Sequence, residues 1–204
     1  DVETAKTTET SYTFTMPDGN VTVSATADIK LTLTDGVYQI GSADEMKILS
    51  DAVNDGYDTT NMSFKLTDNV SLSTAGSFAP IGTKDHSFNG TFDGNDKTVE
   101  LNLDLSDTNH VGLFGYCNSN SVIKNVTTTG SVTGASYVGG IAGYANGKII
   151  NCTNNAAVTA TASCVGGITG QNGYIINCQN QAAVTGPSFV GGIAGTDAEV
   201  TNCL

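Results

Sequence analysis

The second half of the chain repeats its pattern of hydrophobic and small residues with a period near 26 residues. Valine followed by one or two glycines opens four segments, and the leading valines are 27, 27 and 25 residues apart. A second segment, Ile or Val two residues before Asn, recurs at intervals of 26, 26 and 25 residues. Patterns that share one period indicate a repeat architecture. The valine segments are 111–115, 138–143, 165–170 and 190–195.

Each repeat is long enough for about three short strands with turns between them, and no helical period runs through it. One repeat cannot bury both faces of its strands. Stacked coils can, because each strand then pairs with its equivalents above and below at roughly 4.8 Å. The glycine pairs suit tight corners, since glycine adopts positive φ without steric cost. We therefore predict a mainly β fold, a parallel β-solenoid.

Equivalent positions of successive repeats are expected to lie in columns along the stack. The recurring asparagine predicts a ladder of side-chain amides in which each amide bonds to its neighbour. The position after it carries a column of cysteines. These two structural columns comprise Asn125, Asn151, Asn177, Asn202, Cys152, Cys178 and Cys203.

The residue before each leading valine forms another column, which holds His110, Tyr137, Cys164 and Phe189. His110 occupies a position that elsewhere takes an aromatic ring or a thiol, so we assign it a structural role. The copy at 111–115 has Leu-Phe where the others have Gly-Ile. It is one residue out of phase with them, which leaves the register of its strand open.

The first half of the chain has its own pattern, with one helix and one alternating strand. Ser42 and Glu45 form a capping box that begins a helix at about 43–54, and Asn54-Asp55-Gly56 ends it. A solenoid needs its open end covered, so we expect this helix to be an N-terminal cap. Alternating leucines at 99–105 indicate a half-exposed strand. The apolar face of the helix consists of Met46, Leu49, Ala52 and Val53.

Charge separates the two halves. Residues 1–107 hold 18 acidic and 6 basic residues, whereas residues 108–204 hold two of each. The net charge of −12 and the absence of arginine exclude a nucleic-acid binder, which needs a basic footprint for phosphates. No apolar run approaches the roughly 20 residues of a membrane helix, so no membrane insertion is expected.

The order of motifs resembles that of bacterial surface proteins with GLUG-motif repeats. The residues that carry the resemblance are Gly36-Val-Tyr-Gln-Ile40, Ala43-Asp-Glu-Met46, Pro80-Ile-Gly82, Phe88-Asn-Gly-Thr-Phe-Asp-Gly94 and the valine and Asn-Cys segments. It covers about 37–204. It implies a right-handed parallel β-helix within long secreted proteins, some of which carry an IgA-peptidase domain elsewhere, and it implies no assigned chemistry for this region.

Residues 11–27 resemble the last strands of internalin-type β-grasp repeats. The resemblance implies that the chain is a fragment of a longer multidomain protein. We divide it into the end of an upstream domain or linker (1–35), an N-terminal cap with the first coils (36–107) and the repeat solenoid (108–204). We also expect the natural protein to continue beyond residue 204 with more coils or another domain.

Cysteine usage argues against a metal site. No Cys-x-x-Cys spacing is present, and the number of cysteines, five, is odd, so at least one thiol is free. In-register neighbours at roughly 4.8 Å stand too far apart for a relaxed disulfide, which needs Cβ atoms about 3.8 Å apart. We predict mainly buried free thiols, with a strained disulfide as the alternative.

Catalytic groups are sparse. Asp93, Asp96, Asp104 and Asp107 could suggest a Ca²⁺ site or a glycosidase pair, but Asp93-Gly-Asn-Asp96 matches a plain Asx-Gly turn better. Polygalacturonase-type motifs are missing, and a pectate-lyase base would need arginine. We assign His86 a solvent-exposed role in a turn. We predict no enzyme activity and no cofactor.

The function that these observations favour is a non-catalytic structural or adhesion module of a secreted or cell-surface bacterial protein. It would space or present binding surfaces for a host or cell-wall glycan or a protein ligand. The alternative is a carbohydrate-binding β-helix related to polysaccharide-degrading enzymes. Exposed aromatic residues would favour that alternative, and the candidates are Tyr116, Tyr137, Tyr144 and Tyr174.

Overall fold

The computed structural model describes residues 4–8, 11–14, 29–74 and 78–204. The first strands, β1 (Thr4–Thr8) and β2 (Ser11–Phe14), form an antiparallel pair. The strands expected at 11–27 from the internalin-type resemblance lie mostly outside the described residues, which include only β2 of that segment. The domain boundaries at 35 and 107 therefore stay predictions.

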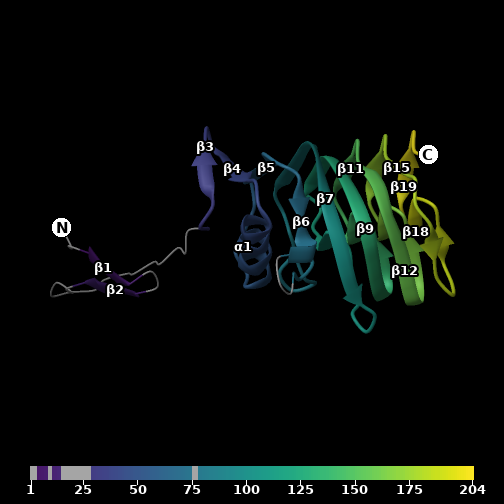
Figure 1. Cartoon of the computed structure of the whole chain (residues 1–204), viewed down its shortest axis with the longest axis horizontal. Coiled ribbons are helices and arrows are strands. Elements are labelled where there is room, and N and C mark those ends of the chain that lie inside the picture. The colour runs from purple at the N-terminus through teal and green to yellow at the C-terminus, as the bar shows by residue number, and fades with distance from the viewer. Residues whose placement is uncertain (1–3, 9–10, 15–28, 75–77) are drawn as a thin grey trace.

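The described chain forms a β-solenoid of about 6 turns with one helix at its N-terminal end, which confirms the predicted fold class. Figure 1 shows the coils following one another along the long axis, from teal through green to yellow. Within the described residues no helix has the length and apolar character needed to cross a membrane.

One strand of each repeat coil belongs to a four-stranded parallel sheet, and the others belong to a larger sheet that wraps the rest of the coil. The small sheet consists of β8 (Phe114–Cys117), β10 (Ala142–Ala145), β13 (Thr169–Gln171) and β18 (Ala194–Thr196). The larger sheet contains β9 (Val122–Gly139), β11 (Lys148–Ile150), β12 (Thr153–Gly166), β14 (Tyr174–Ile176), β15 (Gln179–Asn180), β16 (Val184–Thr185), β17 (Val190–Gly191) and β19 (Glu199–Thr201).

Register follows the repeat, because each strand pairs with its own copy in the next coil. Val158 pairs with Val132 on one side and with Val184 on the other. The shorter valine segment at 111–115 is in the same register as the others after a single corner. Val111 bridges Val138, and Phe114 then pairs with Ala142, so the corner between them is one residue shorter.

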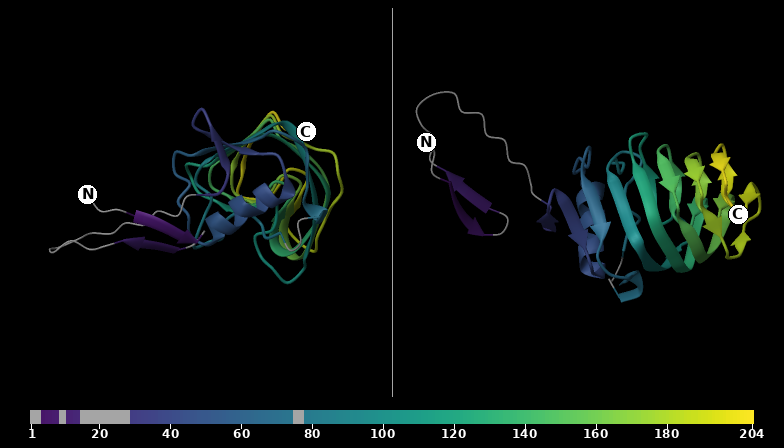
Figure 2. Two further views of the ribbon diagram at one scale, coloured as in Figure 1. Left: turned by 60° about the vertical axis from the view of Figure 1, so that its left-hand side comes forward. Right: turned by 90° about the horizontal axis from the view of Figure 1, so that it is seen from above.

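Helix α1 (Ala43–Asn54) begins and ends where the sequence predicts. The Ser42 hydroxyl accepts a hydrogen bond from the Glu45 amide at 3.2 Å. The buried face includes Ser50, which the hydrophobic pattern does not mark, because its hydroxyl donates to the carbonyl of Ala79 at 2.6 Å. Ala52, assigned to this face from the sequence, is only partly buried. Both views of Figure 2 show α1 at the N-terminal end of the stack.

The first coils join the helix to the repeats. Their parallel strands pair in the order β4, β5, β7 and β9, and the outermost strand β3 runs antiparallel to β4. Along β7, Leu101 and Leu103 are buried while Asn102 and Asp104 are exposed, as expected for a half-exposed strand. These elements are β3 (Thr32–Thr34), β4 (Val37–Ile40), β5 (Ser63–Leu66), β6 (Val70–Ser71), the 3-10 helix η1 (Leu72–Thr74) and β7 (Thr91–Leu105).

One hydrophobic cluster runs from α1 through the coils. Near the cap it is aromatic: the rings of Phe64 and Phe88 lie 5.9 Å apart, and those of Phe88 and Phe114 lie 5.0 Å apart. In later coils valine, isoleucine, alanine and cysteine take over. In the last coil Phe189, Val190 and Val200 are exposed.

Candidate functional site

The corner before each leading valine has a left-handed backbone in every repeat. The angle φ is +60° at His110, +59° at Tyr137, +57° at Cys164 and +51° at Phe189. This conformation is uncommon for bulky side chains and costs roughly 1–2 kcal/mol per residue. Pairing between coils holds it, since the Val111 amide donates to the Tyr137 carbonyl at 3.1 Å. The left-handed backbone recurs in four copies, so it sets the direction in which these side chains leave the main chain.

In the three later valine segments the last glycine packs against this corner of the preceding coil. Gly143 lies directly against the backbone of His110, and Gly170 lies against that of Tyr137 in the same way. A Cβ atom at either glycine would overlap those main-chain atoms. The glycine therefore sets how closely two coils approach at the left-handed corner.

Four rings gather beside the first two of these corners, and we call them the aromatic cluster: His110, Tyr116, Tyr137 and Tyr144. The rings of His110 and Tyr137 are stacked, with centroids 4.9 Å apart and planes 8° apart. Those of Tyr116 and Tyr144 are stacked at 4.2 Å and 12°. His110 also meets Tyr116 edge-on at 5.4 Å. All four side chains are half-buried, so the cluster packs against the protein on one side and is exposed to solvent on the other.

The aromatic cluster carries no charge at neutral pH. Burial, together with the positive charge of Lys84, lowers the pKa of His110. Burial, the hydrogen bond to Tyr144 and the charge of that neighbour raise the pKa of Tyr116 to about 12. The Tyr144 hydroxyl also accepts a hydrogen bond from the Asn172 amide at 2.9 Å. A neutral aromatic platform with a fixed hydroxyl can stack on an apolar ligand face.

Three of the four predicted binding tyrosines thus come together, joined by a histidine to which the sequence assigned only a structural role. Tyr174 lies apart from them. It is on β14 of the larger sheet, where its register neighbours are Lys148 and Glu199, and it is exposed. Tyr137 belongs to the same sheet but lies at the corner that ends β9, beside the small sheet that carries Tyr116 and Tyr144.

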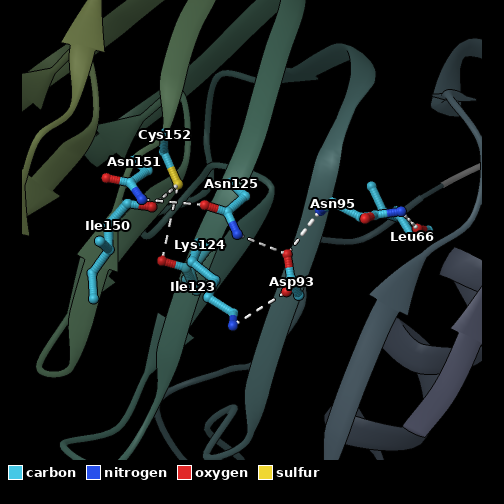
Figure 3. A network of polar contacts seen from close by, with 9 residues as sticks. All are labelled: Leu66, Asp93, Asn95, Ile123, Lys124, Asn125, Ile150, Asn151 and Cys152. Carbon is cyan, nitrogen blue, oxygen red and sulfur yellow. Dashed lines mark hydrogen bonds and ion pairs between the residues drawn. The ribbon is translucent and has the colours of Figure 1, made fainter.

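The asparagine column forms hydrogen bonds along the stack (Figure 3). The Asn151 amide donates to Oδ1 of Asn125 at 3.3 Å, and Asn177 donates to Oδ1 of Asn151 at the same distance. Asn125 in turn donates to Oδ1 of Asp93 at 3.0 Å, so the column extends one coil further toward the cap than the repeats do. Asn202 shares the left-handed backbone of the other three asparagines.

Asp93 forms hydrogen bonds both to the asparagine ladder and within the turn that it begins. Its Oδ1 accepts the Asn95 amide at 2.9 Å, and its Oδ2 lies 3.2 Å from Nζ of Lys124. Burial alone would raise the pKa of Asp93, but the hydrogen bonds from Asn95, Asn125 and Lys124 outweigh it and lower the pKa. Asp104 lies at the other end of β7. In the described parts of the chain no group of three or more His, Cys, Asp or Glu side chains could hold a metal ion.

A second polar ladder is buried, and the sequence reading missed it. The Thr128 hydroxyl donates to Oδ1 of Asn154 at 2.8 Å, and the Asn154 amide donates to Oδ1 of Asn180 at 2.9 Å. Asn154 also bonds both the amide and the carbonyl of Ala156. The signal was present, since Thr128, Asn154 and Asn180 are spaced by 26 residues.

The cysteines of the next column are free thiols, as are Cys117 and Cys164. Their sulfurs point along the stack: Sγ of Cys178 accepts the Cys152 amide at 3.4 Å, and Sγ of Cys203 accepts the Cys178 amide at 3.3 Å. Burial raises the pKa of Cys152 and of Cys117. These groups therefore stay protonated at neutral pH and act as small apolar side chains.

Comparison with known proteins agrees with this picture of a repeat. Residues 134–159, which span most of one coil from the end of β9 into β12, match the Glug family, described as the GLUG motif. A stretch of 122 residues is 33% identical to Halomucin from Haloquadratum walsbyi (strain DSM 16790 / HBSQ001). That stretch covers 56% of this chain and 1% of Halomucin, so the chain corresponds to a small part of that protein.

One solved structure has a similar fold. The crystal structure of a candidate immunoglobulin A1 protease from Bacteroides ovatus matches with a TM-score of 0.52, over 83% of this chain and 75% of that chain. The two sequences are 20% identical, and at this level the likeness concerns the fold alone.

Proposed function

We propose that this chain is a non-catalytic structural module of an extracellular, cell-surface protein, in which stacked coils space and present lateral surfaces. The observation that carries the proposal is the use of polar groups inside the stack. Asp93 is paired with Lys124 and hydrogen-bonded by Asn125, the ring of His110 is stacked on Tyr137, and burial raises the pKa of the Cys152 thiol. No set of described side chains is left to act together as nucleophile, base and oxyanion donor.

The comparisons support the location. The GLUG motif and the likeness to Halomucin suit a module of a surface protein, and a long stack with few charges in its repeats suits a spacer. Its partners would be neighbouring domains of a longer chain and a host or cell-wall glycan or protein ligand. Adhesion and a bacterial source belong to the same proposal.

A turnover assay tests the non-catalytic claim. The chain is incubated with mucin glycans, polygalacturonate, casein and immunoglobulin A1, with and without Ca²⁺, and products are followed by mass spectrometry. We expect no product above the buffer control. Cleavage of any substrate by the wild type that disappears in Asp93→Asn or His86→Phe would overturn the proposal.

Carbohydrate binding is the second candidate, and the aromatic cluster favours it. Stacked tyrosines that are half-exposed offer a platform for the apolar face of a sugar. A glycan array probed with the wild type, Tyr137→Ala and Tyr174→Ala tests this. Saturable binding that Tyr137→Ala abolishes and Tyr174→Ala leaves unchanged would place the site on the cluster. Equal binding by all three would exclude the cluster.

A further inference from the structure

A polar pocket opens where the cap meets the first repeat coil. It has a volume of about 210 Å³, and we call it the cap pocket. The turn after α1, the segment around residues 85–89 and the corner after β8 contribute its walls, and a smaller hollow of about 120 Å³ adjoins it through Asn89. The side chains used below are Tyr57, Asp58, Asp85, His86, Asn89 and Asn118.

His86 is held in one orientation at this pocket. Its Nδ1 lies 2.7 Å from the carbonyl oxygen of Asn54, the last residue of α1. A carbonyl can only accept, so Nδ1 of His86 carries the hydrogen. Asn54 is itself fixed, because its side chain donates to the Pro80 carbonyl at 3.1 Å and accepts the Gly82 amide at 2.9 Å. The ring is therefore positioned by the fold.

Asn89 has a side-chain acceptor that no described residue satisfies. Its main-chain amide donates to the Thr59 hydroxyl at 2.9 Å, and its side-chain amide donates to the Thr60 hydroxyl at 2.7 Å. These bonds fix the side chain. Its Oδ1 is buried, and among the described residues it has no hydrogen-bond partner. A buried polar atom left in this state is destabilising, and a ligand donor that reaches it would remove that cost.

The remaining lining groups also accept hydrogen bonds. Asp58 stays ionised, because the hydroxyl and amide of Thr60 bond its carboxylate and lower its pKa. Asp85 adds a second exposed carboxylate. The two carboxylates make this wall of the pocket negative, so it suits a ligand that presents O–H or N–H groups. No cluster suited to a metal ion occurs in the described parts of the chain, so a cation bound by carboxylates alone is a poorer match.

We propose that the cap pocket binds a single pyranose ring that bears free hydroxyl or amino groups. Its size is below the roughly 300–1,000 Å³ of pockets for drug-sized ligands, so one sugar ring suits it better than an extended chain. Tyr57 supplies an aromatic surface for the ring, and the acceptors take its hydroxyl hydrogens. The carboxylates disfavour acidic sugars. This site is separate from the aromatic cluster, and it adds a ligand to the structural role.

Protein-observed NMR titration of the full chain tests the proposal. The probes are the methyl glycosides of glucose, galactose, mannose and glucosamine, with methyl glucuronide as the acidic match for glucose. We expect at least one neutral or amino glycoside to saturate and to shift the side-chain amide signals of Asn89 and Asn118. Glucuronide should bind at least about tenfold more weakly, because like charges face each other in the pocket.

Variants locate the site. Asp85→Asn should weaken binding of the glucosaminide by about tenfold, since it removes one charge-assisted hydrogen bond. It should also reduce the difference in affinity between the glucosaminide and the glucuronide. Tyr57→Leu should weaken every glycoside. Asp104→Asn, which removes an exposed carboxylate elsewhere, is the matched control and should change nothing. Each variant must first show the melting temperature of the wild type.

Four outcomes would overturn the proposal. They are an absence of saturable binding by every glycoside, binding that Asp85→Asn and Tyr57→Leu leave intact, loss of binding in Tyr137→Ala in place of the pocket variants, and equal binding of the glucosaminide and a simple amine such as butylamine. The third would transfer the ligand to the aromatic cluster, and the fourth would show that the pocket recognises only the charge.

Discussion

Asn154 donates a 2.9 Å hydrogen bond from Nδ2 to Oδ1 of Asn180, one coil further along the stack. The middle glycine of the valine segments belongs to the same arrangement. A Cβ at Gly140 would overlap the side chain of Asn154, and one at Gly167 would overlap that of Asn180. The glycine thus makes room for a buried amide that ties two coils together.

Replacing Asn154 by leucine tests the buried ladder. Leucine is of similar size, but it leaves the buried Thr128 hydroxyl and the main chain of Ala156 without their partner, and Asn180 loses one of its hydrogen bonds. We expect the free energy of unfolding to fall by about 3 kcal/mol or more. Urea denaturation followed by circular dichroism measures this. Asn155→Leu on the exposed face of the same strand is the control, with a change below about 0.5 kcal/mol. Similar losses for both variants would contradict the ladder.

Gly143→Ala tests the close approach of the coils. The added methyl group meets the main chain of His110, which cannot move aside without breaking its pairing to the next coil. We expect a loss of about 2 kcal/mol in unfolding free energy, within the usual range for overpacking. Gly192→Ala adds the same methyl where no atom lies within 4 Å and should be nearly neutral. A neutral Gly143→Ala would show that the coils are spaced more widely.

The ionisation of Tyr116 reports on the aromatic cluster. Its pKa of about 12 lies above the ordinary value of 10.0. The stability that this raised pKa reflects is therefore present below pH 10 and lost as the pH rises toward 12. Tyr144→Phe removes the hydrogen bond and the neighbouring charge, so the pKa of Tyr116 should fall toward 10 while burial keeps it above that value. Carbon-13 NMR of the tyrosine ring measures it, Tyr174→Phe is the control, and an unchanged pKa in Tyr144→Phe would refute the pairing.

The reactivity of each thiol should depend on how deeply it is buried. Cys203 is only partly buried, whereas Cys117, Cys152 and Cys178 are inaccessible, and burial raises the pKa of Cys117 and Cys152. We expect iodoacetamide to alkylate Cys203 first in the native protein, and the three buried thiols to react only after unfolding. Peptide mass spectrometry follows each site. Alkylation of Cys152 as fast as Cys203 would contradict the packing.

Much of the fold can be predicted from the sequence because every repeat carries the same pattern of residues. The helix at 43–54 follows from its capping box and apolar face, and the register follows from the 26-residue period. Ser50 escapes such reasoning, since a polar residue is buried only when a partner from a distant segment meets it, and its partner, the carbonyl of Ala79, carries no sequence signal. Asn154 differs, because Thr128 and Asn180 recur with it at the 26-residue period, although the period does not show that the column is buried.

The candidate sites were harder to predict. Tyr116 and Tyr144 occupy one position in successive coils, and His110 and Tyr137 occupy another, but only the coil geometry shows that these two columns meet. The cap pocket has no repeat signal at all, because its lining comes once from each of three segments of the cap and first coil. A periodic sequence predicts what recurs, and a site built at the junction of the cap and the coils does not recur.

The continuity of the stack is the central claim, since both the fold and the structural role depend on it. Val165 is fully buried, with Val138 paired on one side and Val190 on the other, whereas Lys148 is exposed. Urea unfolding of Val165→Asp and Lys148→Glu therefore tests it most directly. The account predicts that Val165→Asp abolishes the cooperative transition of the repeats, because an unpaired buried charge costs several kcal/mol, and that Lys148→Glu shifts stability by less than about 0.5 kcal/mol. Equal shifts for the two variants would contradict it.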